Sequence, residues 1–337
     1  MTKYISDKLT ILYTILIVMV VYIHGYYLEA KNYTVALFIQ EIFDKGILSV
    51  ANCLFFSISG YLFARNITSI KDVWKKQKKR FRTLLLPYIL WNIIFILWYV
   101  LLAVVPGVSQ FNNSSGMLES IFNQSLSGIL YDIFIKPAAF QLWFLRDLIG
   151  MLIITPLLWY IAKNSWVSAL LMAIASVYFY PWLIYFWLGI IISSQNWDIE
   201  NYPNNKYIVA LACLIFVGYA IAKACGLTPI LYVNTFINLI GLYVVWSLYD
   251  VYSRGKCIAN TGMWKFLCGF SFFIYCFHEP VFNIIKKLAL HVFGVSETTL
   301  IIFYFINPWI MVFMAVIIAR FIARYTPLIY KTLTGGR

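Results

Sequence analysis

Residues 75–82 read KKQKKRFR, and residues 84–105 read LLLPYILWNIIFILWYVLLAVV. The second stretch holds no charged side chain. At about 1.5 Å per helical residue it is long enough to cross the roughly 30 Å hydrocarbon layer of a membrane. A helix also satisfies its backbone hydrogen bonds internally, as the bilayer requires. The two stretches together predict a transmembrane helix that follows a strongly basic segment.

Nine further apolar stretches extend this pattern over the chain. Of its 337 residues, 62% are hydrophobic and 12% are charged, whereas about 25% are charged in soluble proteins. Long, continuous apolar runs favour helices over the short alternating strands of a membrane barrel. We therefore predict an all-α polytopic membrane bundle with spans near 9–27, 46–65, 84–105, 143–161, 165–180, 182–194, 206–224, 230–250, 265–285 and 300–323. Pro181 divides the fifth span from the sixth, which is short enough to be re-entrant.

Lys and Arg are distributed unevenly among the predicted loops. If the N-terminus is cytoplasmic, 19 of the 26 basic residues lie in inner segments and 7 in outer ones. Cytoplasmic loops carry the excess of Lys and Arg, so both termini are predicted to be cytoplasmic. This bias accounts for most of the net charge of +13, and no nucleic-acid partner is needed to explain it. We expect a multi-pass protein of the cell inner (plasma) membrane, with the lipid bilayer as its surroundings.

Ionisable side chains at membrane depth are costly, and each is a candidate for function. His24 lies near the outer end of the first span, and His278 and Glu279 lie in the ninth. Pro280 follows them and, lacking an N–H, frees a backbone carbonyl for another partner. Histidine suits general-base catalysis because its pKa is near neutrality. The alternative for both histidines is a hydrogen bond that packs one helix on another.

Short motifs occur in four segments along the chain. Residues 9–24 end in Tyr-Ile-His, 54–62 read LFFSISGYL, 141–148 read QLWFLRDL and 270–280 read FSFFIYCFHEP. Together with the basic segment 75–82 and its following Leu-Pro-Tyr, they resemble the acyltransferase 3 family. Members of that family are integral membrane acyltransferases that modify cell-surface polymers. The resemblance covers essentially the whole chain and implies one transmembrane acyltransferase domain over residues 1–337.

The resemblance implies transfer of an acyl group, usually acetyl, from cytosolic acetyl-CoA to a hydroxyl of a cell-surface or lipid-linked glycan. Acetyl-CoA is then a donor substrate; no permanently bound cofactor and no metal are expected. A succinyl donor stays an alternative. A transporter or flippase of a lipid-linked saccharide is a second interpretation of the many spans, and a sensory or scaffold domain with the same fold is a third.

The chemistry needs a base for the sugar hydroxyl and hydrogen-bond donors for the oxyanion. We assign the base to His24. Some of the other candidates have structural alternatives. Ser59 lies in a small-residue stretch suited to helix packing, and the alternative for Arg146 and Asp147 is that they neutralise each other. The expected catalytic residues are His24, Ser59, His278 and Glu279, and the expected substrate or oxyanion residues are Tyr61, Trp143, Arg146 and Asp147.

The phosphates of the donor require a cationic inner surface. The basic segment and the end of the second span supply one, although positive-inside topology and attraction to anionic lipid would select the same residues. The expected donor-binding residues are Arg65, Lys75, Lys79, Arg80 and Arg82.

One position departs from the family pattern. The family usually has Arg or Lys eleven residues before its histidine, and here that residue is Tyr13. Either Lys8 or a residue of the basic segment supplies the charge, or the activity differs.

The route of the acyl group also stays open. The thioester reaches His24 between the helices for direct transfer, or His24 or His278 first accepts the acyl group.

Overall fold

The structure, a computed structural model, describes residues 1–104, 125–137, 139–163, 165–178, 180–228 and 230–336. Helices occur in all ten predicted regions, and these described residues contain no strand. The prediction of an all-α fold is confirmed. The elements are α1 (Lys3–Ile23), η1 (Leu28–Asn32), α2 (Thr34–Glu41), η2 (Ile42–Gly46), η3 (Ile47–Ser49), α3 (Val50–Ala64), α4 (Ile70–Val104), α6 (Leu126–Phe134), η4 (Phe140–Leu142), α7 (Trp143–Ile161), α8 (Ser165–Tyr178), α9 (Leu183–Ser194), α10 (Lys206–Ala224), α11 (Leu231–Ser253), α12 (Gly262–Leu267), α13 (Ser271–Phe293), α14 (Glu297–Tyr325) and α15 (Pro327–Leu333).

Seven helical stretches within the described residues are long and apolar enough to cross a membrane. The helices α8 and α9 are apolar but shorter, and α13 carries ionisable residues along its length. The bundle thus has the composition and helix lengths of a polytopic membrane protein. The seven stretches are Lys3–Ile23, Thr34–Ala64, Ile70–Leu101, Phe140–Ile161, Lys206–Ala224, Tyr232–Ser253 and Glu297–Tyr325.

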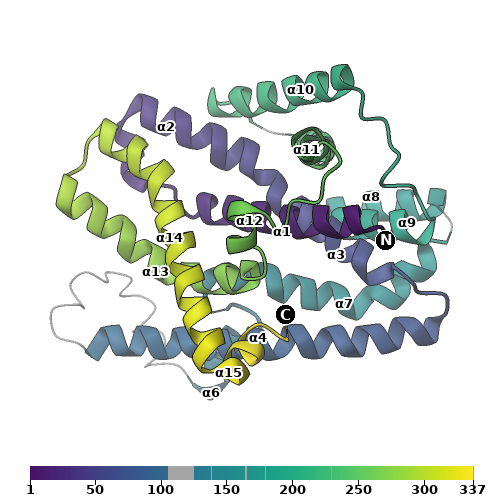
Figure 1. The fold of residues 1–337 in the computed structure, drawn as a ribbon, viewed down its shortest axis with the longest axis horizontal. Coiled ribbons are helices and arrows are strands. Elements are labelled where there is room, and N and C mark those ends of the chain that lie inside the picture. Colours follow the sequence, from purple (N-terminus) through teal and green to yellow (C-terminus); the bar gives the residue numbers. More distant parts are fainter. Residues whose placement is uncertain (105–124, 138, 164, 179, 229, 337) are drawn as a thin grey trace.

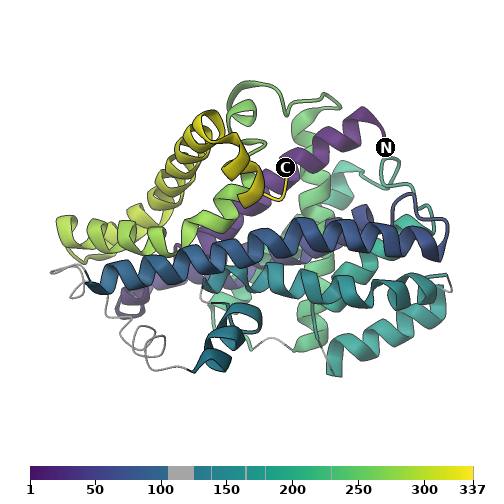
Figure 2. The ribbon, with the colours of Figure 1, turned by 90° about the horizontal axis from the view of Figure 1, so that it is seen from below.

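The basic segment lies on α4 itself, because this helix begins at Ile70, well before the predicted apolar boundary. A reciprocal cap fixes the start. The backbone N–H of Asp72 donates to Ser69 Oγ over 3.3 Å, and the N–H of Ser69 donates to Asp72 Oδ2 over 3.0 Å. Such a pair satisfies N–H groups that have no partner within the helix. Figure 1 shows α4 along the lower edge of the molecule with α7 beside it, and in Figure 2, seen from below, α4 crosses the front.

The first helix runs through the middle of the bundle and contacts α3, α13 and α14 (Figure 1). Its apolar side chains are fully buried at Ile11, Leu12, Leu16 and Val21. They belong to one large apolar cluster to which most of the helices contribute. Because α1 is held on several sides, the residue at its C-terminal end has a fixed position.

Two glycines bring α3 and α9 into backbone contact. A Cβ atom at Gly60 would clash with the carbonyl oxygen of Phe186, and one at Gly189 would clash with the carbonyl oxygen of Ser57. Small residues allow this close approach in membrane helices. The glycine of the LFFSISGYL motif, Gly60, therefore has a packing role.

The ninth predicted span is interrupted at two places. The short α12 ends at Leu267, and Gly269 has a φ of 95°, so α13 starts at Ser271, later than the expected residue 265. Within α13, Glu279 has non-helical backbone angles (φ −101°, ψ 141°). This break is where the candidate site lies.

Candidate active site

The break in α13 is stabilised by a side chain from another helix. Pro280 has no N–H to donate to the carbonyl of Cys276. Gln141 replaces it, since its Nε2 donates to Cys276 O over 2.8 Å and to Glu279 O over 2.9 Å. The prediction that Pro280 frees a carbonyl for another partner is confirmed. The break turns Glu279 out of the regular helical register.

Three of the predicted site residues meet at this break. The Nδ1 atom of His24 lies 3.7 Å from Glu279 Oε1, and the ring centroids of His24 and His278 are 4.9 Å apart. Asn283, one turn further along α13, donates to Glu279 Oε2 over 2.6 Å. His278 is fully buried and Glu279 is 8% exposed. The site therefore places a carboxylate and two imidazoles together in a largely buried position.

The C-terminal end of α1 is held by a cation. His24 caps this helix, and the ammonium of Lys286 donates to His24 O over 2.7 Å and to Tyr26 O over 3.3 Å. A positive charge at a helix C-terminus is stabilising, because the carbonyls there have no partner within the helix. Lys286 thus fixes the backbone that carries the His24 ring.

The hydrogen bonds of His278 define its tautomer. Its Nδ1 lies 2.8 Å from Tyr275 O and 3.2 Å from Ile274 O. A carbonyl oxygen only accepts, so Nδ1 carries the proton. In the neutral ring Nε2 is then an unprotonated acceptor. Among the described residues it has no hydrogen-bond partner, although it is buried.

A cavity of about 420 Å³ is lined by residues of α1 and α13 that precede His24 and His278 along these helices. On α1 it extends from Thr10 to Val20, which is about 15 Å of helix. Val20 lies one turn before His24, and Tyr275, another lining residue, lies one turn before His278. Among the described residues that line it, Arg80 alone is charged. The full lining is Thr10, Tyr13, Ile17, Val20, Asn52, Phe55, Ser59, Leu62, Phe63, Arg80, Leu84, Phe144, Leu145, Leu148, Leu152, Phe186, Gly269, Ser271, Phe272 and Tyr275.

The predicted donor-binding residues divide between this cavity and the surface. Arg80 lines the cavity, while Lys75, Lys79 and Arg82 are exposed on the first turns of α4. Arg65 follows α3, and its carbonyl accepts a hydrogen bond of 2.5 Å from Lys76 Nζ.

The predicted oxyanion residues are more dispersed. Ser59 lines the cavity, whereas Tyr61, Trp143, Arg146 and Asp147 are not among its lining residues. Trp143 packs on Trp182, with ring centroids 5.8 Å apart. Arg146 Nε donates to Asp147 Oδ1 over 2.7 Å, and Tyr180 donates to the other oxygen of Asp147. Arg146 and Asp147 therefore pair with each other, as the structural alternative for them requires.

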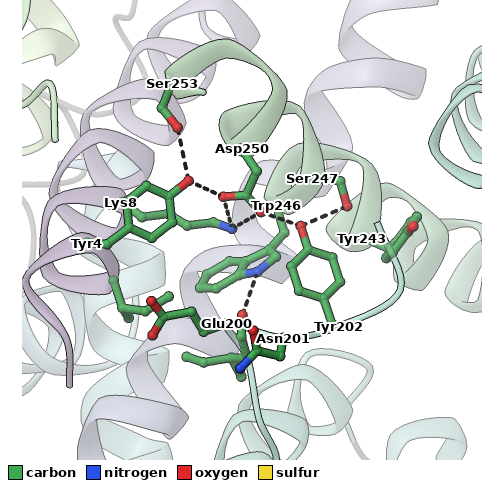
Figure 3. A network of polar contacts seen from close by, with 12 residues as sticks. Tyr4, Lys8, Glu200, Asn201, Tyr202, Tyr243, Trp246, Ser247, Asp250 and Ser253 are labelled. Atoms are coloured by element: carbon green, nitrogen blue, oxygen red, sulfur yellow. Dashed lines mark hydrogen bonds and ion pairs between the residues drawn. The ribbon is translucent and has the colours of Figure 1, made fainter. Parts of the chain in front are cut away.

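Lys8 is engaged elsewhere. Its Nζ lies 2.8 Å from Asp250 Oδ2 and 3.9 Å from the ring centroid of Trp246. The hydroxyls of Tyr4 and Tyr202 also donate to Asp250, so a polar network joins α1 to α11 (Figure 3).

Two substitutes were considered for the basic residue missing at position 13, Lys8 and a residue of the basic segment. Arg80 of that segment lines the same cavity as Tyr13, and Lys8 does not.

Three residues that contact the site did not stand out in the sequence. Gln141 belongs to a quoted motif, but nothing local shows that its side chain reaches α13. Lys286 falls just past the expected end of the ninth span, although α13 continues to Phe293. Asn283 is four residues after Glu279, and this helical spacing was the one available signal.

Comparisons with known proteins cover nearly the full chain. The model of a family described as an acyltransferase domain matches residues 8–323. The chain is also similar to the succinoglycan biosynthesis protein ExoH of Rhizobium meliloti (strain 1021). The two are 24% identical over 360 residues, and the match covers 99% of this chain and 93% of the relative. No solved structure matches significantly.

Proposed function

We propose a function for this chain from the premise that it belongs to the acyltransferase 3 family of integral membrane acyltransferases. It is a membrane O-acyltransferase of the cell inner membrane that moves an acetyl group from cytosolic acetyl-CoA to a hydroxyl of a cell-surface or lipid-linked glycan. The relative from succinoglycan biosynthesis supports the glycan class of acceptor. The observation that carries the proposal is the meeting of His24, His278 and Glu279 one helical turn beyond a cavity that Arg80 lines.

The cavity suits the long arm of an acyl-CoA. Its volume of about 420 Å³ is in the range of ligand pockets, about 300 to 1,000 Å³. Arg80 at the wall and the exposed Lys75, Lys79 and Arg82 nearby on α4 offer cations for the phosphates. Most of the lining is apolar, so an uncharged pantetheine chain and a small neutral acyl group match it better than a carboxylated acyl group.

The acceptor hydroxyl needs a base, and His24 has the required partner. Glu279, 3.7 Å from Nδ1, favours the tautomer with a proton on Nδ1 and leaves Nε2 to take the hydroxyl proton. The carboxylate also stabilises the imidazolium that forms, as in an acid–base triad. Ser59 lines the cavity and offers a hydroxyl to the oxyanion.

Release of free CoA thiol from purified protein tests this function. The protein in lipid nanodiscs receives acetyl-CoA and candidate glycans, and thiol and acylated glycan are both measured. We expect His24→Gln to lower the turnover by about 10²- to 10⁴-fold, the usual contribution of a positioned base. His291→Gln is the matched control, because His291 is exposed at the far end of α13.

Two results would contradict the proposal. Thiol release that is unchanged in His24→Gln would remove His24 as the base. Movement of a lipid-linked saccharide across the membrane of proteoliposomes without any thiol release would instead identify a flippase. Parallel assays with acetyl-CoA and succinyl-CoA decide which acyl group is transferred.

A further inference from the structure

We propose that His278 is the acyl carrier of this reaction. Its Nε2 accepts the acyl group from the thioester, and His24 then takes the proton of the acceptor hydroxyl as the hydroxyl oxygen attacks the acyl group. This inference rests on the proposed function and adds a covalent step to it.

The first support is the state of the His278 ring. Nδ1 is held by the carbonyls of Ile274 and Tyr275, and Nε2 is buried without a partner among the described residues. A buried polar atom without a hydrogen bond is unfavourable and calls for an explanation. An unprotonated nitrogen that is fixed in direction and not engaged is the arrangement that a nucleophile needs.

The second support is the difference between the two imidazoles. His24 faces the carboxylate of Glu279, and this negative charge stabilises a proton that the ring takes. His278 has neutral carbonyls on Nδ1 instead. These carbonyls stabilise a positive ring by accepting its remaining N–H, and they have no proton to exchange. One histidine is equipped for proton transfer and the other for carrying an acyl group.

The third support is the position of the two rings relative to the cavity. Tyr275, one turn before His278, lines the cavity, and its ring centroid lies 6.4 Å from that of His278. A donor that enters past Arg80 thus approaches His278 from the cavity side. With the acyl group on His278, CoA leaves before the glycan binds, and donor and acceptor need not occupy the site together.

Both steps balance. In the first, the Nε2 lone pair attacks the thioester carbonyl carbon, a C–N bond forms, the C–S bond breaks, and CoA leaves as a thiolate while the ring becomes an acyl-imidazolium. In the second, the acceptor oxygen attacks the acyl carbon, a C–O bond forms, and the C–N electron pair returns to Nε2. His24 takes the hydroxyl proton, which finally neutralises the thiolate through solvent. The sum is thioester plus alcohol to ester plus thiol.

Isotope exchange without acceptor tests the inference. Purified protein is incubated with acetyl-CoA and labelled free CoA, and label entering acetyl-CoA is measured. We expect exchange in the wild type, loss by at least about 100-fold in His278→Gln, and exchange within several-fold of wild type in His24→Gln, which fails to acylate glycan. Glutamine keeps an amide donor for the two carbonyls, and thermal unfolding of each variant verifies folding.

Labelling of the wild type makes the test independent of any variant. After a single turnover with labelled acetyl-CoA and removal of free donor, mass spectrometry locates the acetyl group, which we expect on residue 278. Glycan acylation with no exchange, or a label on Ser59 or His24, overturns the inference and leaves the proposed function standing. Absence of glycan acylation with every donor is the separate failure of the proposed function itself.

Discussion

Glu279 serves two neighbours with its two carboxylate oxygens. Oε1 lies 3.7 Å from His24 Nδ1, and Oε2 accepts the hydrogen bond of 2.6 Å from Asn283. The break in the helix at this residue allows the side chain to turn toward α1. His24 thus has the charged neighbours Glu279 and Lys286, whereas the Nδ1 of His278 bonds to neutral carbonyls.

Replacing Glu279 by Gln should separate catalysis from binding. We expect kcat to fall by about 100-fold, because the imidazolium of His24 loses its counter-charge. The KM for acyl-CoA should change little, since the cavity proposed to bind the donor is not lined by Glu279. Steady-state kinetics measure both. The control Asn283→Ala keeps the carboxylate and should lose much less; an equal loss in the two variants would show that orientation, and not charge, matters.

Arg80 and Lys79 form a matched pair for testing the proposed donor site, because they are adjacent in sequence but different in surroundings. Arg80 lines the cavity and Lys79 is exposed. A hydrogen bond to a charged group contributes about 1.5 to 3 kcal/mol, so we expect Arg80→Gln to raise the KM for acyl-CoA by about 10- to 100-fold. Lys79→Gln should change it less than about threefold. Equal effects would point to a diffuse surface attraction instead.

At the scale of helices, α3 and α9 depend on two glycines, and the chain offers a control. A methyl group at Gly60 meets the backbone at Phe186, whereas one at Gly150 on α7 meets no atom within 4 Å. We expect Gly60→Ala to destabilise the protein by about 1 to 3 kcal/mol, the usual cost of overpacking. Gly150→Ala should be neutral or slightly stabilising. Thermal unfolding in detergent measures both, and similar midpoints would exclude close packing at Gly60.

The α1–α11 connection is predicted to be sensitive to loss of one charge. Lys8→Met leaves Asp250 with hydroxyl donors only, and breaking a buried ion pair costs about 3 to 5 kcal/mol. We expect a clear fall in the unfolding temperature. The double variant Lys8→Met/Asp250→Leu should recover part of it, because no unpaired charge remains. A double variant less stable than Lys8→Met would show that the hydroxyl network around Asp250 contributes more than the charge.

For the whole molecule, two exposed cysteines report on the predicted orientation. Cys225 follows α10 at the predicted outer end, and Cys257 lies in the predicted inner segment after α11. With both termini inside, a membrane-impermeant maleimide added to intact cells should label Cys225 and spare Cys257. Permeabilised cells should show both labels. The reverse pattern in intact cells would overturn the orientation that the Lys and Arg distribution predicts.

The sequence predicts the helices because the cause is local. Continuous apolar runs fix where a chain in lipid must be helical, and Pro181 fixes where α8 and α9 are separated. Boundaries were displaced where a side chain acts at short range. The Ser69 cap extends α4 backwards over the basic segment, which no hydropathy pattern indicates.

Which of these side chains contact one another, in contrast, was decided only by the tertiary structure. The sequence singled out His24, His278 and Glu279 by their depth in apolar segments, but it did not show that they touch one another, that Arg146 pairs with Asp147 or that Lys8 pairs with Asp250. Helix formation needs only neighbours along the chain. Contacts between helices far apart in sequence depend on how side chains and small residues such as Gly60 pack, and that is settled only when the bundle assembles.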